Sequence, residues 1–444
     1  MGIWFRAKNE QEIITHIKKG EPSLYLQAKT STVINYDHIE QFAEQNHIRL
    51  VDLSQLKSQL EWKDSETIKI KGATSWLELK NFAQLKGRRV MTSPTEEYAG
   101  VLAGLATSCT GEHAFGYGTL RDQVESCRFI NYAGERMLLE KNQSIKSCGL
   151  DHLLIEDYLK CYERYRFFKN APFPRLQQAT DLMIGSEGQL GVITEAVVKT
   201  ALLEPSDYYF ILVPRWELNC SAHIEIVHKI QNYRGKVLTV ELVDWNSLAC
   251  LPKTEWNQKV NHDVIFMEVL CKYSEEIFEN LIADMESISM DDVFSFDEIR
   301  FNRLRKAVPR FINEMNSRKG IIKTGTDVQV SVAEIEHLFA YYQEFTKVGI
   351  KYNLFGHLGD AHLHFNFLPD HEQTKKCDDL LQTFYKEISF WNASPFAEHG
   401  IGLIKQKHMH NFWNETILSM FKHCKEIFDP KGIFFPQGYM GTKH

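Results

Sequence analysis

The chain has 444 residues, of which 43% are hydrophobic and 25% charged, and its net charge is -7. These values are typical of a globular protein with more than one domain, and they argue against a general nucleic-acid surface. No window reaches the roughly 18 unbroken apolar residues of a membrane-spanning helix. Nine scattered cysteines without a Cys-x-x-Cys pair argue against a disulfide framework or an iron–sulfur cluster. The charged start, Met1 to Glu10, lacks the apolar core of a signal peptide.

The N-terminal part of the chain alternates between helix and strand patterns. The predicted elements are a helix over 10–19, a strand over 23–26, a polar turn over 27–32, and a helix and strand at about 37–52. Ser75 and Glu78 have the spacing of a capping box, so a helix is expected to begin there and to run to about Lys86. Its apolar residues keep helical spacing, which predicts a core-facing role rather than a cofactor contact.

Three stretches that follow are rich in glycine and small residues. They cover 93–111, 115–124 and 181–194, and a strand pair across the turn 133–135 follows the second. Glycine lets a backbone approach a ligand closely and hydroxyl side chains add donors, so the stretches suit a phosphate-bearing cofactor. Glycine-rich packing loops are the alternative. The stretches contain neither a Gly-Lys-Ser/Thr phosphate loop nor a Gly-x-Gly-x-x-Gly motif between strand and helix.

The middle of the chain has the pattern of an α+β domain. Strands are expected over 208–213, 237–243 and 264–270, and helices at about 216–232 and 274–287. This order favours an antiparallel sheet with helices packed against it.

The stretch Gly356–Asn366 holds three histidines, an aspartate and an asparagine. Its second half alternates polar and apolar residues as a strand does, so His362, His364 and Asn366 are predicted to share one face. Two glycines predict a tight turn that carries His357 just before that strand. Imidazoles in this arrangement suit a divalent metal or proton transfer. A solvated strand edge with hydrogen-bonded histidines is the alternative.

A second polar stretch lies at Ala397–Gly402, where Glu398 and His399 are adjacent on a glycine-flanked bend. Two histidines and one glutamate make an open metal site that keeps positions for a substrate. A further histidine beside such a site can act as a general base. The Glu-His-Gly stretch is a weak signal alone, and the histidine-rich stretch strengthens it.

With these motifs, the chain resembles the FAD-linked oxidases and dehydrogenases of the vanillyl-alcohol-oxidase type, in the branch of the D-lactate, glycolate and D-2-hydroxyglutarate dehydrogenases. The motifs that carry the resemblance are Ser93–Asp122, Gly185–Thr194, Gly356–Asn366, Glu398–Gly402 and Asp429–Phe434. The resemblance implies an α+β fold in three parts. These are a two-lobed FAD-binding domain over 1–205, a substrate or cap domain with an antiparallel sheet and the histidine cluster over 206–415, and a C-terminal segment over 416–444 that returns to the flavin.

The resemblance also implies that the glycine-rich stretches hold FAD without a covalent bond. The residues expected to bind it are Pro94, Thr95, Gly104, Thr107, Ser108, Gly111, Gly116, Tyr117, Gly118, Asp122, Glu187, Gly188, Gly191, Val192 and Ile193. Two departures from the family's pattern bear on this expectation. The turn 27–32 has no glycine for close backbone approach to phosphate and no histidine for covalent attachment, although Lys29 and hydroxyls remain. Residues 435–438 read Phe-Pro-Gln-Gly where the family tends to have Asn-Pro-Gly-Lys, so an asparagine contact at the flavin edge is missing.

By the same resemblance we expect oxidation of a small, D-lactate-like D-2-hydroxy acid to the 2-oxo acid. Arg305 would hold the substrate carboxylate, with a solvated helix-end arginine as the alternative and Lys323 as a second candidate. His399 is the expected general base, and Asn366 is expected near the substrate. His362 stands where the branch has asparagine, so it is a ligand, a second base or a bystander.

A zinc or manganese ion is expected between His357, His364 and Glu398, where it would polarise the substrate hydroxyl. The expected partners are the hydroxy acid and an electron acceptor, which is a quinone, an electron-transfer flavoprotein, a cytochrome or oxygen. A homodimer is an open alternative. We expect a cytoplasmic protein, with peripheral contact to the inner face of a membrane left open. The rival functions are oxidation of glycolate or a bulkier 2-hydroxy acid, and a flavin-poor accessory subunit on the same scaffold.

Overall fold

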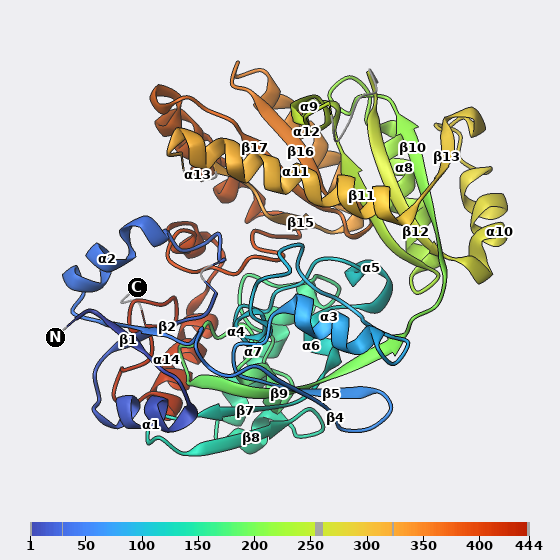
Figure 1. Ribbon diagram of the computed structural model, residues 1–444. Coiled ribbons are helices and arrows are strands. Elements are labelled where there is room, and N and C mark those ends of the chain that lie inside the picture. Colours follow the sequence, from blue (N-terminus) through green and yellow to red (C-terminus); the bar gives the residue numbers. More distant parts are fainter. Residues whose placement is uncertain (1, 29, 254–260, 322–323, 442–444) are drawn as a thin grey trace. The chain divides into compact units, whose positions relative to one another are not determined.

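The computed structural model describes residues 2–28, 30–253, 261–321 and 324–441, and the chain forms two compact units (Figure 1). Unit 1 comprises Met1–Gly111, Thr119–Leu203 and Glu398–His444, and unit 2 comprises Glu112–Gly118 and Glu204–Ala397. The longer segment of unit 2 begins at Glu204, close to the boundary predicted at residue 205. Residues 398–415, which the sequence interpretation assigned to the second domain, group with unit 1.

Unit 1 contains a parallel and an antiparallel sheet. The three-stranded parallel sheet has the order β1 (Trp4–Arg6), β3 (Arg49–Asp52), β2 (Ser23–Leu26). The antiparallel sheet has the order β4 (Gln59–Trp62), β5 (Thr67–Lys71), β9 (Val192–Leu202), β7 (Val124–Ile130), β8 (Arg136–Glu140), and β6 (Arg88–Val90) also pairs with β9. The long strand β9 thus begins directly after the glycine-rich stretch that ends at Gly191, and it anchors that stretch to the sheet.

Helices complete unit 1. They are α1 (Glu10–Lys18), α2 (Ile39–Gln45), α3 (Trp76–Gln84), α4 (Val101–Ala106), α6 (Leu120–Gln123), α7 (His152–Tyr162) and α14 (Glu415–Phe428). The predicted capping box is present at α3, where the Ser75 side chain accepts a hydrogen bond from the Glu78 amide and the Glu78 side chain accepts one from the Ser75 amide. Trp76 and Leu79 of this helix are fully buried, which confirms the predicted core role for them. For Leu85 the prediction is wrong, because α3 ends at Gln84 and Leu85 is 83% exposed just beyond it.

The segment after α14 returns to the N-terminal sheet. The Ser23 amide donates to the Ile433 carbonyl at 2.8 Å, and the Phe435 amide donates to the Ser23 carbonyl at 2.8 Å. The Tyr439 hydroxyl donates to the Gly185 carbonyl at 2.7 Å, so the same segment also reaches the glycine-rich loop before β9. In Figure 1 this red segment lies beside the blue strand β2. The sequence expected a C-terminal segment that returns to the cofactor region, and its contacts are with the loop at 185–191.

Unit 2 is built on one antiparallel sheet. Its strands follow the order β13 (Val293–Phe296), β10 (Ser206–Val213), β12 (Asp263–Leu270), β11 (Val237–Val243), β16 (Tyr352–His357), β17 (His362–Phe367), β15 (Val328–Val330), β18 (Ala393–Ser394), and β14 (Thr324–Gly325) also pairs with β17. Every named pairing in this sheet is antiparallel, as the sequence predicted.

The helices of unit 2 are α5 (Ala114–Tyr117), α8 (Ser221–Ile230), α9 (Trp245–Cys250), α10 (Ser274–Ile277), α11 (Glu298–Lys319), α12 (Ile335–Thr346) and α13 (Thr374–Ile388). The longest of them, α11, is capped by the Asp297 side chain, which accepts a hydrogen bond from the Arg300 amide, and it ends at the left-handed Gly320. Its apolar side chains, among them Phe301 and Ile312, share a core cluster with Phe266 of the sheet. Figure 1 shows α11 running along the sheet of unit 2.

Two predicted elements differ from the structure. His357 was predicted on a turn, but it is the last residue of β16, and the turn is formed by Leu358–Asp360. Gly356 lies inside β16. A Cβ atom at this position would come within 2.8 Å of the His362 carbonyl oxygen, so glycine lets β16 and β17 approach closely. The helix predicted at 274–287 is shorter, since α10 passes into a single π-helical turn at Phe278–Ile282.

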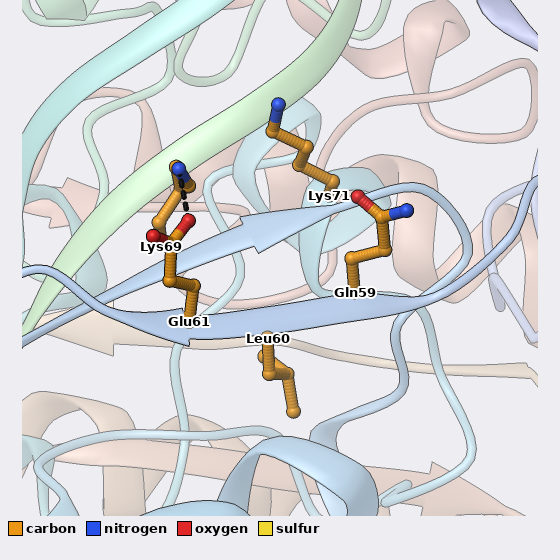
Figure 2. Close-up of a pocket in the computed structure, with 5 residues that line it drawn as sticks. All are labelled: Gln59, Leu60, Glu61, Lys69 and Lys71. Atoms are coloured by element: carbon orange, nitrogen blue, oxygen red, sulfur yellow. Dashed lines mark ion pairs between the residues drawn. The ribbon is translucent and has the colours of Figure 1, made fainter.

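A surface hollow lies over the β4–β5 hairpin of unit 1 (Figure 2). Its lining residues are Gln59, Leu60, Glu61, Lys69 and Lys71. Glu61 and Lys69 form an ion pair across the hairpin. None of the residues predicted to be functional lines this hollow, so it does not enter the candidate site.

Candidate active site

The histidine-rich stretch folds into the neighbouring strands β16 and β17. Their register places His357 opposite His362, Phe355 opposite His364, and Asn353 opposite Asn366. Residues directly opposite each other in an antiparallel pair point to the same side of the sheet, and so do alternate residues along a strand. The prediction that His362, His364 and Asn366 share one face is therefore confirmed, and His357 joins them from the neighbouring strand.

The three imidazoles on this face form a compact group. The ring centroids of His362 and His364 are 4.6 Å apart, and that of His357 is 5.3 Å from the first and 6.3 Å from the second. Each of the three offers a nitrogen that lies within 4.8 Å of the nitrogens of the other two. All three side chains are buried, at 8% exposure or less. Buried imidazoles at this spacing are the donor set that a divalent transition metal accepts.

Each imidazole is oriented by an acceptor on another strand or loop. His357 Nδ1 lies 2.8 Å from Glu241 Oε1, and His362 Nε2 lies 2.9 Å from Asp327 Oδ1. His364 Nδ1 lies 3.2 Å from the carbonyl oxygen of Thr326. Carboxylate and carbonyl partners of this kind fix the tautomer and the ring orientation of metal-binding or proton-transferring histidines. The face thus has both the imidazoles and the groups that hold them.

Arg305, the predicted carboxylate-binding residue, lies on α11 and is buried. Its guanidinium forms an ion pair with the Glu112 carboxylate. Glu112, Glu241 and Glu268 all raise the pKa of Arg305, although desolvation, the largest single effect, lowers it. The guanidinium is therefore a fixed cation, and protein carboxylates surround it.

Glu112 belongs to the seven-residue stretch 112–118, which groups with unit 2 while both flanking segments group with unit 1. His113 follows it with a left-handed φ of 61°, and His113 Nε2 lies 2.8 Å from Glu268 Oε2. Gly118 closes the stretch with a φ of 82°. Strained backbone that is held by a charged network is a feature of functional loops.

The predicted cofactor residues Gly116, Tyr117 and Gly118 lie in this stretch and thus in unit 2. A Cβ atom at Gly116 would come within 2.8 Å of Leu238, so glycine is required there for packing against β11. The other predicted cofactor residues all lie in unit 1. Asp122 caps α6, where it accepts hydrogen bonds from Thr119, and Arg175 donates to it at 3.3 Å.

Two of the glycine-rich loops of unit 1 are hydrogen-bonded to each other. The Gly185 amide donates to the Leu105 carbonyl at 3.1 Å, and the Glu187 amide donates to the Ala106 carbonyl at 2.7 Å. Beyond α4, Ser108 adopts a left-handed φ of 51°. The sequence prediction treated the loops separately, and the fold makes one backbone platform of them.

The turn after β2 reaches the same platform. The Gln27 side chain accepts a hydrogen bond from the Ala103 amide at 3.3 Å, and a Cβ atom at Gly100 would lie 2.2 Å from Gln27 Oε1. Ala28 has a left-handed φ of 60°, a conformation that glycine adopts without strain. Ala28 thus adopts a conformation that favours glycine, although no glycine is present between residues 27 and 32. Lys29, like Lys323 of unit 2, lies outside the described residues.

The platform fits a polar cofactor. A Cβ atom at Gly104 would come within 2.6 Å of Cys109 Sγ, and one at Gly111 would come within 2.5 Å of the Ser93 carbonyl, so the backbone approaches its neighbours closely. Among the described residues, the hydroxyls of Thr110 and Thr194 are buried and have no hydrogen-bond partner within the protein. Unpaired buried hydroxyls beside closely approaching backbone are the donors and acceptors that a bound nucleotide requires.

The Glu398–Gly402 bend is held by Glu187. The Glu187 carboxylate accepts hydrogen bonds from the Ile401 amide at 2.6 Å and from the Gly402 amide at 2.9 Å. Desolvation raises the pKa of Glu187 to about 7, against the lowering effect of these two amides. A Cβ atom at Gly400 would lie 2.6 Å from Glu187 Oε1, so glycine at 400 is what lets the carboxylate approach. The predicted base His399 is thus carried by a bend with a fixed backbone.

Glu398 is buried beside the first loop. A Cβ atom at Gly111 would lie 2.6 Å from Glu398 Oε1, so this glycine makes room for the carboxylate. In the chain, Glu398 directly follows Ala397, the last residue of unit 2, and the Ala397 amide donates to the Asp327 carbonyl at 2.9 Å. Asp327 is also the partner of His362.

Sequence reasoning did not assign a role to Glu112, Glu241 or Asp327. A signal for Glu241 is present in the sequence, because it is the only charged residue in the apolar strand Val237–Val243. A lone carboxylate in a buried strand needs a partner. The identity of that partner depends on strand register over more than a hundred residues, which no local pattern reveals.

None of the helices that the structure describes has the length and apolar character that crossing a membrane requires.

Comparison with known proteins agrees with these features. Residues 208–438 match the family described as FAD linked oxidases, C-terminal domain, and residues 23–139 match the family described as FAD binding domain. The chain is similar to D-lactate dehydrogenase of Anaerostipes hadrus, with 23% identity over 389 residues that cover 84% of this chain and 76% of that protein. It is also similar to D-2-hydroxyglutarate dehydrogenase of Stutzerimonas stutzeri, with 22% identity over 98% of this chain and 86% of that protein.

Among solved structures, an alkyldihydroxyacetonephosphate synthase resembles the chain with a TM-score of 0.66 at 15% sequence identity. The match covers 98% of this chain and 77% of the synthase. At this identity the likeness concerns the fold, and it confirms the predicted α+β architecture.

Proposed function

This chain belongs to the family of FAD-linked oxidases, and on that premise we propose that it oxidises a small D-2-hydroxy acid to the 2-oxo acid. The observation that carries the proposal is the face of β16 and β17, where three buried imidazoles are each oriented by an acceptor. Side chains of this kind can polarise a substrate hydroxyl group and accept its proton. The relatives named D-lactate and D-2-hydroxyglutarate dehydrogenase support the substrate class.

FAD, when bound, supplies the hydride acceptor for C2 of the substrate. The residues proposed to hold it are those of the two hydrogen-bonded loops, with Thr107, Ser108 and Gly111 on the first and Glu187, Gly188 and Gly191 on the second. Their part is binding, because backbone groups that glycine leaves accessible can donate to phosphate. The left-handed φ of Ala28 supports this assignment, since it is a backbone conformation that glycine adopts readily.

Arg305 is proposed to hold the substrate carboxylate, because a guanidinium binds a carboxylate through two parallel hydrogen bonds. Burial excludes competing water and strengthens that interaction. Asn366 is proposed to contact the substrate beside His364. These groups orient the hydroxyl at C2 toward the imidazoles.

The hydroxyl proton is proposed to pass to His399. The clamp of the Glu187 carboxylate on the following amides supports this role, because a general base must be held in position. His362 is the second candidate base. Its Nε2 lies 2.9 Å from the Asp327 carboxylate, an arrangement that fixes the orientation of an imidazole.

His357, His364 and Glu398 are proposed to hold a zinc or manganese ion, which would polarise the substrate hydroxyl. The Glu241 carboxylate and the Thr326 carbonyl support the two histidines as ligands by fixing their rings. Glu398 would supply a carboxylate of the kind that completes an open site of two histidines and one glutamate. The reducing equivalents would leave for a quinone, a flavoprotein, a cytochrome or oxygen.

The test is the visible absorption spectrum of the purified, metal-analysed protein, before and after anaerobic addition of D-lactate, glycolate or D-2-hydroxyglutarate. We expect a flavin band that one or more of these acids bleaches. L-lactate and L-2-hydroxyglutarate are the matched controls for the two chiral acids and are expected to leave the band unchanged.

The outcomes separate the rival functions. A band bleached by glycolate or a bulkier acid and not by D-lactate would move the substrate within the class. A band that no hydroxy acid bleaches, even with metal added, would contradict the proposal. A protein that binds no flavin would favour an accessory subunit on the same scaffold.

A further inference from the structure

The face that carries the histidines continues into a pair of asparagines. Asn353 on β16 lies directly opposite Asn366 on β17, two residue pairs beyond Phe355 and His364 and therefore on the same face. Side chains of directly opposed residues have Cβ atoms about 5 Å apart, and the next pair on the same face is about 7 Å further along the strands. The two carboxamides therefore form the next row of the face on which the substrate would lie.

Both asparagines are fully buried, and three of their four side-chain polar atoms have no hydrogen-bond partner among the described residues. Neither the amide nitrogen nor the oxygen of Asn353 has a hydrogen-bond partner among the described residues. The oxygen of Asn366 also lacks one there, and the Asn366 amide nitrogen lies 3.5 Å from the His364 carbonyl oxygen, a long contact. Because both amide atoms of Asn353 are unpaired, the conclusion does not depend on which way that group is turned. Buried amide groups without hydrogen-bond partners are rare in folded proteins. The unpaired atoms of Asn353 and Asn366 therefore indicate that a ligand binds to them.

A glycine leaves space for one of these amides. Gly325 on β14 lies opposite Asn366, and a Cβ atom at Gly325 would come within 2.4 Å of Asn366 Oδ1. Glycine at position 325 thus leaves room for the Asn366 side chain. Any other residue at 325 would displace that side chain.

The chemistry of the row limits what it can bind. Two unpaired amide oxygens require hydrogen-bond donors, and the unpaired amide nitrogen of Asn353 requires an acceptor. A methyl group, as in lactate, offers neither, and a carboxylate, as in 2-hydroxyglutarate, offers no donor. A hydroxyl group offers both.

We infer that Asn353 and Asn366 are the distal part of the substrate site and that they select 2-hydroxy acids with further hydroxyl groups, which are sugar acids by chemical class. The inference rests on the proposed function, because it needs a hydroxy acid bound at the imidazoles. It adds Asn353 to the site as a specificity-determining residue.

The experiment compares acids of equal length in which a hydroxyl replaces a methyl group. The pairs are D-glycerate with D-2-hydroxybutyrate, and D-2,4-dihydroxybutyrate with D-2-hydroxypentanoate. The FAD-loaded full chain is mixed anaerobically with each acid, and the rate of flavin bleaching is measured against concentration. We expect the hydroxylated member of at least one pair to be preferred by about 100-fold or more, since a site built to hydrogen-bond a hydroxyl strongly rejects the analogue that lacks it.

The variant Asn353→Leu keeps the size of the side chain and removes its hydrogen bonds. We expect the preference for the hydroxylated acid to fall about tenfold in this variant. Asn219→Leu is the control, because Asn219 is exposed before α8, where its side chain accepts a hydrogen bond from the Ser221 amide. The control is expected to keep the preference of the unchanged protein.

The outcomes separate this inference from the proposed function. Bleaching by the deoxy acids at equal or higher rates would overturn the inference and leave the function standing. An unchanged preference in Asn353→Leu would also overturn it, because the amide would then hold only buried water. If no hydroxy acid bleaches the flavin, the proposed function fails and the inference fails with it.

Discussion

The Glu112 carboxylate and the Arg305 guanidinium form a buried ion pair in which each side chain is only 7% exposed. Arg305 is the cation proposed to hold the substrate carboxylate, so a protein carboxylate occupies the position that the substrate would take. Substrate binding then requires the exchange of one carboxylate for another on the same guanidinium. The left-handed His113 and Gly118 belong to the short stretch that carries Glu112.

The first prediction concerns this exchange. In Glu112→Gln the charge that competes for Arg305 is removed, while Glu241 and Glu268 remain near the guanidinium. We expect the dissociation constant for the hydroxy acid to fall several-fold, with a smaller change in the maximal rate of flavin reduction. Anaerobic stopped-flow titration measures both. Glu276→Gln, which alters a surface ion pair with Lys236, is the control. Weaker substrate binding in Glu112→Gln would assign Glu112 a supporting role for Arg305.

The second prediction concerns the clamp on the Glu398–Gly402 bend. Glu187→Gln keeps one oxygen acceptor and loses the second, so the amides of Ile401 and Gly402 can no longer both be held by a carboxylate. We expect flavin reduction to slow by about tenfold or more while FAD content is retained, because a small displacement of a general base is costly for the rate. Rapid-reaction spectra and the ratio of FAD to protein measure the two effects. The control Glu195→Gln alters an ion pair on β9, and an equal loss there would contradict the clamp.

The third prediction concerns metal. If His357 and His364 hold an ion, treatment with a chelator should abolish substrate-dependent bleaching, and zinc or manganese should restore it. The variant His364→Asn should bind less metal, and neither the chelator nor added metal should change its bleaching. The control His228→Asn, at an exposed histidine, should keep the metal content of the unchanged protein. Elemental analysis beside the spectra gives the result. Full activity in metal-free protein would leave the imidazoles as proton carriers only.

The fourth prediction concerns pH and a pair of buried carboxylates in unit 2. Desolvation, together with the neighbouring Asp263, raises the pKa of Asp244 to about 8. A carboxyl group with a raised pKa in the folded state keeps its proton there longer than in the unfolded chain. The free energy of unfolding therefore decreases as pH rises from 3.8, the ordinary pKa of an aspartate, to about 8, the pKa of Asp244 in the folded chain. Above pH 8 this group causes no further decrease.

The variant Asp244→Asn removes this loss and keeps the capping of α9, since asparagine is also a good helix cap. We expect its advantage in the free energy of unfolding over the unchanged protein to grow between pH 6 and 8, by up to about 1.4 kcal/mol per pH unit, and then to level off. Denaturant titrations at pH 6, 7, 8 and 9 measure it. Asp151→Asn, at the exposed cap of α7, should show no such trend. A constant difference at all four pH values would contradict the raised pKa.

Local patterns predicted the elements that local physics determines. The strands at 23–26 and 237–243 have the predicted bounds, and the Ser75–Glu78 capping box is present as expected. The shared face of His362, His364 and Asn366 follows from the period of a strand, and the register confirms it. In each case the controlling interactions lie within a few residues of one another, so the sequence contains the needed information.

The remaining features depend on distant pairing. His357 was assigned to a turn because glycine on both sides is typical of turns, but Gly356 serves the close approach of β16 to β17. The partners Glu241 and Asp327 reach the histidines through strands far away in the sequence. The Glu112–Arg305 pair joins residues 193 positions apart, and nothing near either residue predicts the other. Such pairs become visible only when the sheet is assembled.

The order of segments in unit 1 has a consequence for synthesis on the ribosome. Residues 398–444 belong to unit 1 but are made after the whole of unit 2. In the folded chain, Ser23 of β2 forms backbone hydrogen bonds with Ile433 and Phe435. A domain folds as a unit once its residues have emerged. Unit 2 can therefore complete its sheet while β2 still has an unpaired edge, and the nascent N-terminal part must wait for the later segment. A protein that is stalled or cut between the two would expose that edge strand, the kind of surface that other chains join in aggregation.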